Sequence, residues 1–318
     1  RKERLTVFID EIQKLPSLLE IVHLLLERHS ERVRFLLTGS SARKIKRGAA
    51  DMLAGRLLSL QLHPLLEEEY TMPLDQRLLH GSLPVVALSE SNRDRLLKAY
   101  VNTYLKEEIY AESLVRKLDT FARFLEIAGQ YHGQILNASS IARVLNVSSH
   151  TVDGYFQILE DTLLSYSLPG WSASVRKQLR KAPKFYLFDN GVANALRGEL
   201  KVELKESSSR FGELFEALVV QEIYRYNEYK QLDWKLSYWK NQSGHEVDLV
   251  LSRGMGQPLA AIEIKSSTKP KPSSLQGLAS FSSDYPEVPQ YCICRTPFPY
   301  REKEIEFLPW KEAVGSLE

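Results

Sequence analysis

Apolar and polar residues alternate most regularly near the C-terminal end of the chain. Residues 246–253 and 257–264 form two alternating runs on either side of a turn that contains glycine and proline. Alternation with a period of two, interrupted by such turn formers, predicts a β-hairpin.

Four further elements are predicted around this hairpin. Apolar residues at helical spacing cover 211–229 and about 273–285, while short runs typical of strands cover 235–239 and 290–294. The order helix, strand, hairpin, helix, strand predicts a mixed sheet flanked by helices.

Two apolar runs near the N-terminus, 5–9 and 33–37, are typical of strands in a parallel sheet that is covered on both faces. An amphipathic helix is expected between them, at about 17–28. Asp10 and Glu11 follow the first strand. Phosphoryl-transfer enzymes place such a pair there, because the aspartate helps to hold Mg²⁺ and the glutamate polarises the attacking water. The alternative is an acid pair that caps the next loop and helix.

The middle of the chain is predicted to be helical from 65 to 129, with prolines marking breaks, and then to form a helix-turn-helix over 139–159. Two strands, 163–168 and 184–189, are expected to complete a winged helix. The first helix has Ser139 or Ser140 as its expected cap, and the second has Ser148 or Ser149.

The second helix of this pair contains no Arg or Lys, which disfavours reading of DNA bases. Contact with phosphates would depend on a basic run between the two wing strands, formed by Arg176, Lys177, Arg180 and Lys181. We therefore expect non-specific, salt-sensitive DNA contact. The alternative is a winged helix that serves only to pack against other parts of the protein.

Candidate chemistry is concentrated in the predicted hairpin. Asp248 lies on its first strand, and Glu263 and Lys265 lie two residues apart on the second, so the latter two share a face. Carboxylate oxygens are ligands that Mg²⁺ and Mn²⁺ prefer, and a lysine can hold a water or a phosphate oxygen. This set suits metal-assisted cleavage of a phosphodiester. The alternative is an ion pair on a solvated strand edge, although the apolar neighbours of Glu263 favour a buried strand.

This arrangement of Asp248, Glu263 and Lys265 resembles the PD-(D/E)XK nuclease superfamily. The resemblance implies a restriction-endonuclease-like fold and a further glutamate from the helix before the hairpin. Glu216 is the expected residue, with Glu213 and Glu222 as alternatives.

The order of motifs in the whole chain resembles the AAA-type ATPases found beside a domain known as DUF4143. The resemblance implies that Asp10 and Glu11 are the Walker B pair, with Asp10 as a ligand of Mg²⁺. It further implies that Ser40 is a sensor residue and that Arg56 acts near the nucleotide. The family's Tyr-Leu-x-x-Asp-Ile stretch is matched at 104–109, where a glutamate replaces the aspartate.

These features predict a multidomain α/β protein. The expected order is the C-terminal part of a P-loop ATPase core, a helical lid, a winged helix-turn-helix and a nuclease-like mixed sheet with flanking helices. The corresponding residues are 1–63, 64–129, 130–190 and 191–318.

Overall composition adds few constraints. The formal net charge is +2, from 42 basic and 40 acidic residues, so only local patches can favour a nucleic-acid partner. The two cysteines, Cys292 and Cys294, are expected to be reduced thiols of a cytoplasmic protein, since a disulfide between them would be strained. No apolar run is long enough for a membrane span, and no signal peptide is recognised.

Two functions fit this sequence. In the first, the chain is part of an ATP-dependent, nucleic-acid-associated protein with a nuclease domain that uses Mg²⁺ or Mn²⁺. In the second, it is a STAND-like regulatory ATPase whose nuclease-like domain is non-catalytic and binds a protein partner. An oligomer is compatible with both.

No Gly-x-x-x-x-Gly-Lys-Ser/Thr sequence is present in the chain, and this loop is what cradles the phosphates of a nucleotide. We therefore expect the acids at Asp10 and Glu11 to lie in the middle of a domain whose earlier part precedes this sequence. We expect no ATP turnover by the purified 318-residue chain, whereas a parent protein with the loop hydrolyses ATP. Phosphate release that is abolished by Glu11→Gln would contradict this.

Overall fold

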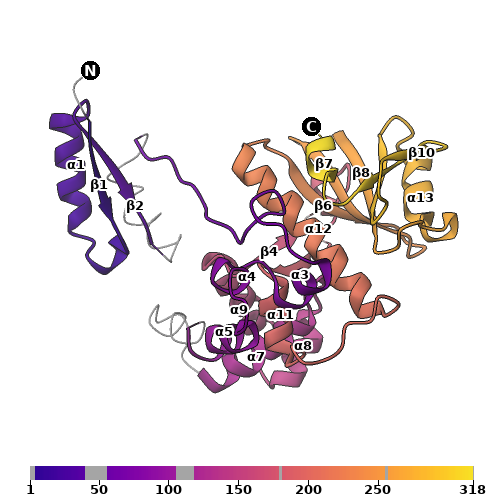
Figure 1. Ribbon diagram of the computed structural model, residues 1–318, viewed down its shortest axis with the longest axis horizontal. Coiled ribbons are helices and arrows are strands. Elements are labelled where there is room, and N and C mark those ends of the chain that lie inside the picture. The colour runs from indigo at the N-terminus through magenta and orange to yellow at the C-terminus, as the bar shows by residue number, and fades with distance from the viewer. Residues whose placement is uncertain (1–3, 40–55, 105–117, 179–180, 255–256, 318) are drawn as a thin grey trace. The chain divides into compact units, whose positions relative to one another are not determined.

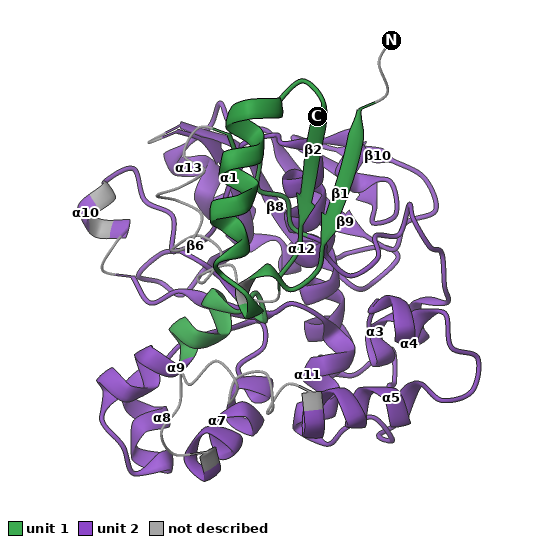
Figure 2. Cartoon of the chain, turned by 90° about the vertical axis from the view of Figure 1, so that its left-hand side faces the viewer, with its two compact units in different colours: residues 1–61, 156–165 green, residues 62–155, 166–318 purple. Residues whose placement is uncertain are grey.

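The computed structural model of the protein describes residues 4–39, 56–104, 118–178, 181–254 and 257–317. The chain divides into two compact units (Figure 2). Residues 1–61 and 156–165 make up the first, and residues 62–155 and 166–318 make up the second.

In the first unit, β1 (Leu5–Ile9) and β2 (Val33–Leu37) pair in parallel, and α1 (Leu18–His29) connects them. A short 3₁₀ turn, η1 (Ile12–Lys14), follows β1. The core of this unit contains Ile12, Leu19 and Val22, packed against Phe35, Leu37 and other side chains of the strands. Both predicted strands and the predicted helix are confirmed.

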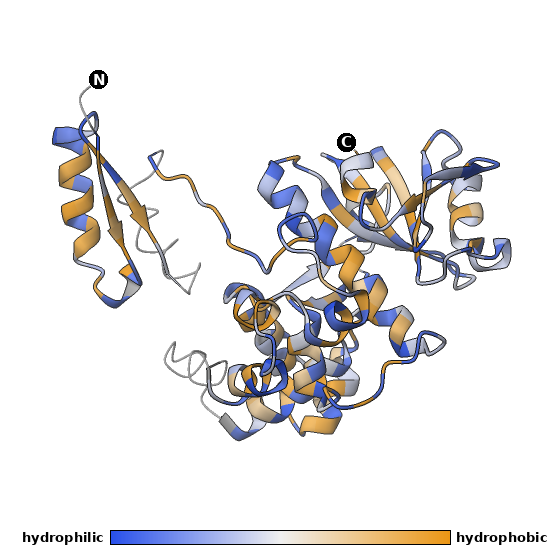
Figure 3. Cartoon of the chain, viewed as in Figure 1, coloured by the Kyte–Doolittle hydropathy of each residue, from blue (hydrophilic) through white to orange (hydrophobic). Residues whose placement is uncertain are grey.

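Large apolar side chains of this two-stranded sheet are also exposed. Figure 3 colours much of these two strands as hydrophobic. Phe8 and Leu36 are 63% and 52% exposed. The side chains of β1 and β2 alternate between covered and solvent-facing positions, so α1 covers only one face of the pair.

The second unit begins with helices, as predicted for residues 65–129 within the described residues. They are α3 (Leu74–His80), α4 (Pro84–Ala87), α5 (Arg93–Ala99), the π turn η2 (Tyr100–Tyr104) and α7 (Leu118–Gln130). The later helix α11 (Asn190–Arg197) packs against α3 and α7.

A helix pair and a small sheet follow. The helices are α8 (Ala138–Leu145) and α9 (Ser149–Asp161), and the short α10 (Val175–Gln178) comes later. The strands β3 (Gln134–Ile135), β4 (Ser165–Leu168) and β5 (Lys184–Leu187) form a sheet in the order β3-β5-β4.

The caps of this helix pair test the sequence-based expectations. Ser148 accepts a hydrogen bond from the backbone N–H of Thr151 at 3.1 Å, so it caps α9 as predicted. The expected caps Ser139 and Ser140 of α8 were wrong. Asn137 caps that helix, because its side-chain oxygen lies 3.0 Å from the backbone nitrogen of Ser140. An asparagine one residue before the helix satisfies an otherwise free N–H group equally well.

The last part of the chain contains a mixed sheet of six strands. Figure 1 shows this sheet with its neighbouring helices. The helices are α12 (Ser209–Lys230), α13 (Gln276–Asp284) and α14 (Ala313–Ser316). The strands are β6 (Lys235–Lys240), β7 (Glu246–Arg253), β8 (Gln257–Lys265), β9 (Gln290–Cys294), β10 (Tyr300–Glu302) and β11 (Ile305–Pro309). A 3₁₀ turn, η3 (Pro272–Ser274), precedes α13.

The order across this sheet is β10-β11-β9-β8-β7-β6. β6, β7 and β8 are antiparallel neighbours, whereas β8, β9 and β11 run in parallel. Ile262 packs in the core that includes α12, and its neighbour Ala261 packs in the core that includes α13. Because successive side chains of a strand point to opposite faces, the two helices cover opposite faces of the sheet. The predicted order of helix, strand, hairpin, helix and strand is confirmed.

The small sheet and the large sheet are joined at β6. The backbone N–H of Trp171 donates to the carbonyl of Tyr238 at 2.6 Å, and Gly170 forms a parallel bridge with the same residue. Trp171 is 2% exposed and packs against Trp239 and Phe281. The continuation of β4 therefore extends the edge of the large sheet.

A buried guanidinium connects three segments of the second unit. Arg77 on α3 is fully buried, and it donates to Glu67 at 3.0 Å and to Glu222 on α12 at 2.9 Å. It also donates to the backbone carbonyls of Leu65 and Tyr70. Four acceptors around one planar cation compensate most of the cost of removing it from water.

We expect Arg77→Met to lower the free energy of unfolding by about 3–5 kcal/mol, because Glu67 and Glu222 would each lose a fully buried counter-charge. Lys311, 2.9 Å from Glu67, and Arg225, 3.9 Å from Glu222, would then be the cations left beside them in the described part of the chain. Urea denaturation of the full chain measures this.

The control is Arg301→Met, which removes an arginine from an ion pair with Glu304 whose side chains are 67% and 82% exposed. A loss at Arg77 no larger than at Arg301 would contradict the expectation.

Candidate functional site

The strands β7 and β8 separate at the position of Asp248. Their last paired residues at this end are Leu249 and Ile262. Beyond them, a carboxylate oxygen of Asp248 accepts a hydrogen bond from the backbone N–H of Ile264 at 2.7 Å. The side chain thus takes the place of a strand carbonyl, which fixes a buried carboxylate between the two strands.

Glu263 and Lys265 lie beside it on β8. The ammonium of Lys265 is 2.6 Å from Oε1 of Glu263 and 3.8 Å from Oδ2 of Asp248. Glu263 is buried, and its Oε2 has no hydrogen-bond partner within the described part of the chain. The three groups predicted from the hairpin are therefore brought together.

Close packing of α13 encloses this carboxylate. A Cβ atom on Gly277, in the first turn of α13, would lie 1.8 Å from the carbonyl oxygen of Glu246 and 3.1 Å from Oε2 of Glu263. Only a residue without a side chain allows the helix this close to β7. The approach of the helix excludes solvent from Glu263.

Glu216 of α12 joins the cluster through residues that the sequence analysis did not select. The ammonium of Lys184 on β5 lies 2.8 Å from Oε1 of Glu216 and 2.8 Å from Oε1 of Glu246. The hydroxyl of Tyr186 donates to the same oxygen of Glu216 at 3.0 Å. The sequence marks Lys184 as unusual, since this lysine opens a strand that is otherwise Phe-Tyr-Leu, but it does not indicate the partners of the lysine.

The structure also separates the alternatives for the helix glutamate. Glu222 belongs to the ion pairs of Arg77, where it also accepts from the backbone N–H of Glu67 at 2.9 Å. Glu213 lies within electrostatic range of Arg197. Glu216 is the one whose charge acts on Glu263 and Lys265.

Burial and mutual repulsion shift the protonation of these groups. Burial, followed by the charge of Asp248, raises the pKa of Glu263 to about 8. The same two causes raise the pKa of Glu216. Burial alone would lower the pKa of Lys265, but the carboxylates of Asp248 and Glu263 outweigh it and raise the pKa above the usual range.

Carboxylate oxygens are the ligands that a hard divalent cation prefers, and Oε2 of Glu263 has no hydrogen-bond partner among the described residues. In the described ranges, however, no three His, Cys, Asp or Glu side chains are arranged to hold a metal. Lys265 occupies one oxygen of Glu263. The predicted metal ligands Asp248 and Glu263 therefore stay predictions.

In the first unit, the predicted acid pair lies where β1 and β2 end. The hydroxyl of Thr38 donates to a carboxylate oxygen of Asp10 and accepts from the backbone N–H of Glu11, the latter at 3.2 Å. Glu11 adopts the left-handed conformation, with φ 51° and ψ 49°. Ser40 lies outside the described residues, and Arg56 is exposed.

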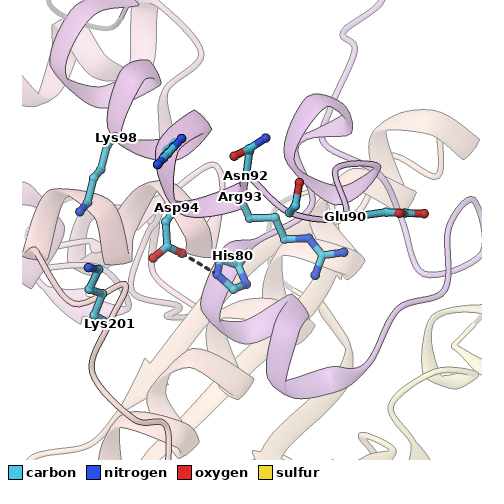
Figure 4. A pocket seen from close by; sticks show the side chains of 9 residues that line it. His80, Glu90, Asn92, Arg93, Asp94, Lys98 and Lys201 are labelled. Carbon is cyan, nitrogen blue, oxygen red and sulfur yellow. Dashed lines mark hydrogen bonds and ion pairs between the residues drawn. The ribbon is translucent and has the colours of Figure 1, made fainter.

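A separate hollow of about 430 Å³ opens between α5 and the C-terminal end of α3 (Figure 4). His80 and Asp94 meet on its wall, 2.9 Å apart, and the side chains of Lys98 and Lys201 reach toward each other. Its full lining is His80, Glu90, Ser91, Asn92, Arg93, Asp94, Arg95, Lys98 and Lys201. The predicted site residues are not part of it.

Three family models match successive parts of the chain. Residues 1–71 match an AAA domain, residues 72–205 match a domain of unknown function (DUF8612), and residues 211–313 match a domain of unknown function (DUF4143). These matches support an AAA-type ATPase-like protein.

The chain is also similar to curated proteins that are described as uncharacterized. A protein of Mycobacterium tuberculosis and one of Mycobacterium bovis are each 28% identical over 267 residues, which is 83% of this chain and 59% of theirs. A Haemophilus influenzae protein is 24% identical over 210 residues, which is 60% of this chain and 52% of its own length. The chain thus spans less than two thirds of the length of these relatives. No solved structure matches it.

Within the described residues, no helix is both long enough and apolar enough to cross a bilayer.

We expect the stability difference between the wild type and Glu263→Gln to depend on pH. The folded state raises the pKa of Glu263 to about 8, so it binds a proton that the unfolded state releases above about pH 4.5. Between these values the wild type loses stability relative to the variant as pH rises, by up to about 1.4 kcal/mol per pH unit. Urea denaturation of both proteins at pH 5, 6.5 and 8 measures the difference. A difference that is constant over this range would contradict it.

Proposed function

We propose that this chain is part of an AAA-type ATPase-like protein whose last hundred or so residues form a metal-dependent site for phosphodiester cleavage in a nucleic acid. The observation that carries the proposal is the convergence of Glu216, Asp248, Glu263 and Lys265 from α12, β7 and β8. This placement agrees with the PD-(D/E)XK resemblance, in which the aspartate and the Glu-x-Lys pair lie on adjacent strands.

Mg²⁺ or Mn²⁺ would be held by Asp248 and Glu263, with Glu216 and the carbonyl of Ile264 nearby, and would act as a Lewis acid on the phosphate. The backbone N–H of Ile264 donates to Oδ2 of Asp248 and so holds the carboxylate in place. The other oxygen of Asp248 would then be free to bind the metal. Lys265 is 26% exposed, which allows its ammonium to leave Glu263 and bind a phosphate oxygen or the attacking water. There it stabilises the negative charge that develops on the phosphate.

The remaining parts would regulate this site. In a parent protein that contains the phosphate-binding loop, Asp10 would help to hold Mg²⁺ and Glu11 would polarise water, so that ATP drives a motor or a switch. The α8–α9 pair with β4 and β5 would act as a winged helix. One charge of its basic run would not be available for DNA contact, because Lys181 donates to the carbonyls of Trp171 and Lys240.

One observation favours the second candidate, a STAND-like regulator with a non-catalytic nuclease-like domain. Lys184 and Lys265 already neutralise part of the charge of the acid cluster without a metal. Such a domain would bind a protein partner, since a fold does not fix an activity.

We expect the full chain to cleave single-stranded DNA in the presence of Mn²⁺. Asp248→Asn and Lys265→Met should each reduce the rate by about 100-fold or more, because each removes a charge that acts on the transition state. Asparagine keeps the acceptor for the N–H of Ile264, so the first variant tests charge rather than folding. Gel analysis of end-labelled DNA measures the rate.

The matched control is Lys269→Met, which removes an exposed lysine outside the cluster. Cleavage that survives Asp248→Asn unchanged would locate the activity elsewhere. An absence of both cleavage and Mn²⁺ binding would favour the regulatory function.

A further inference from the structure

An arginine beside the candidate site is held by an acid from a neighbouring segment. Arg295 directly follows β9, which runs parallel to β8 and pairs Cys294 with Lys265. Nη1 of Arg295 also donates to the carbonyl of Ser266, the residue after Lys265, at 3.4 Å. Arg295 and Lys265 therefore emerge at the same end of the large sheet.

The guanidinium of Arg295 is placed by the fold before any ligand binds. Its central carbon lies 5.3 Å from the centroid of the Phe211 ring on α12, and Phe211 is buried. The backbone N–H of Arg295 donates to the carbonyl of Ser267 at 3.1 Å, so the loop after β8 also fixes its position. The side chain is still 22% exposed, so solvent reaches it.

Glu206 occupies the two outer nitrogens of this guanidinium. Nη1 of Arg295 lies 2.8 Å from one carboxylate oxygen, and Nη2 lies 3.1 Å from the other. Glu206 belongs to the segment 198–208 between α11 and α12, and its side chain is 70% exposed. The hydrogen bonds and the charge of Arg295 lower the pKa of Glu206, so its carboxylate is an anion at neutral pH.

Release of Arg295 requires little rearrangement. Leu204 packs against the core that includes α12 and so holds the backbone of the segment 198–208, which leaves only the side chain of Glu206 to rotate. An exposed ion pair contributes little to stability, because water screens its charges. Glu206 is therefore easily replaced by a ligand that offers Arg295 the same contacts.

A phosphate group offers these contacts. Two parallel N–H donors of an arginine bind a carboxylate and a phosphate with the same bidentate geometry. We propose that Arg295 binds a backbone phosphate of single-stranded nucleic acid and that Glu206 is a removable stand-in for that phosphate. This inference rests on the proposed function, which brings a nucleic acid to this end of the sheet, and goes beyond it by naming a residue that holds the strand. In the alternative, the ion pair only ties the segment 198–208 to the sheet.

The test measures the affinity of the full chain for a fluorescein-labelled single-stranded oligodeoxynucleotide of about 20 nucleotides, which exceeds the site size of one single-strand-binding module. Fluorescence anisotropy is recorded in EDTA, so that binding is observed without cleavage. Glu206→Gln should tighten binding by about 3- to 10-fold, because a neutral amide competes less well for Arg295.

The matched control is Glu203→Gln. It removes the same charge from the same segment, and the side chain of Glu203 is 79% exposed and 3.7 Å from Lys205. This variant should change the affinity by less than about 2-fold, because salt and water screen its charge.

Arg295→Met should weaken binding and reduce the slope of log affinity against log salt by about 0.7, which is the contribution of one phosphate contact with a single strand. Glu206→Gln should no longer tighten binding in this background. Arg295→Lys keeps the charge but loses the two parallel donors, so it should bind more weakly than the wild type with an unchanged slope. The control is Arg301→Met, which removes an exposed arginine and should keep the slope of the wild type.

The outcomes separate this inference from the proposed function. Equal effects of Glu206→Gln and Glu203→Gln, or a gain from Glu206→Gln that persists beside Arg295→Met, would overturn the role of Arg295 and leave the cleavage site untouched. An absence of oligonucleotide binding in every variant would also overturn it, and the cleavage assay with Mn²⁺ would then decide the proposed function by itself. If Arg295→Met does not fold, the comparison of Glu206→Gln with Glu203→Gln decides, because both change exposed side chains.

Discussion

Compensation of buried charge is the constraint on which the second unit depends. Arg77 is fully enclosed and is matched by one carboxylate and two carbonyls of the segment just before α3, and by the carboxylate of Glu222 on the distant helix α12. An unpaired ion in this environment costs several kcal/mol, so α12 cannot move away from α3 without a large loss of stability. Lys184 applies the same rule at the candidate site, where it holds α12 and β7 together through Glu216 and Glu246. The buried cation Arg77 and the lysines of the candidate site therefore both compensate buried carboxylates. They differ in exposure, since the side chain of Arg77 is 0% exposed and that of Lys265 is 26% exposed.

The buried charges of the candidate site are only partly compensated. Asp248 is satisfied by a backbone N–H, and Glu216 by a lysine and a tyrosine, but one oxygen of Glu263 has no partner in the described part of the chain. Gly277 brings α13 against this carboxylate, and desolvation raises its pKa to about 8. Groups with such shifted pKa values are common at functional sites, and this is why Glu263 is a candidate site residue.

Much of this arrangement followed from local sequence pattern. Period-two alternation predicted β7 and β8, and placed Glu263 and Lys265 on one face, because that inference needs only the geometry of a single strand. Lys184 could not be found in this way, since its contact with Glu216 joins elements 32 residues apart. The cap of α8 was misassigned among neighbouring polar residues, where Asn137 competes with two serines. Position within a strand is encoded locally, whereas a pairing between elements depends on how the whole chain packs.

The join between the two sheets has a consequence for how this protein can evolve. The match to DUF4143 begins at residue 211, after Trp171 and Lys184. A segment cut at that boundary would leave Trp239 and Phe281 without the indole that covers them, and Glu216 without its ammonium. We therefore expect that the last hundred residues do not fold stably on their own. Recombination that transfers them to another protein must carry the preceding small sheet as well, so the two should be inherited as one block.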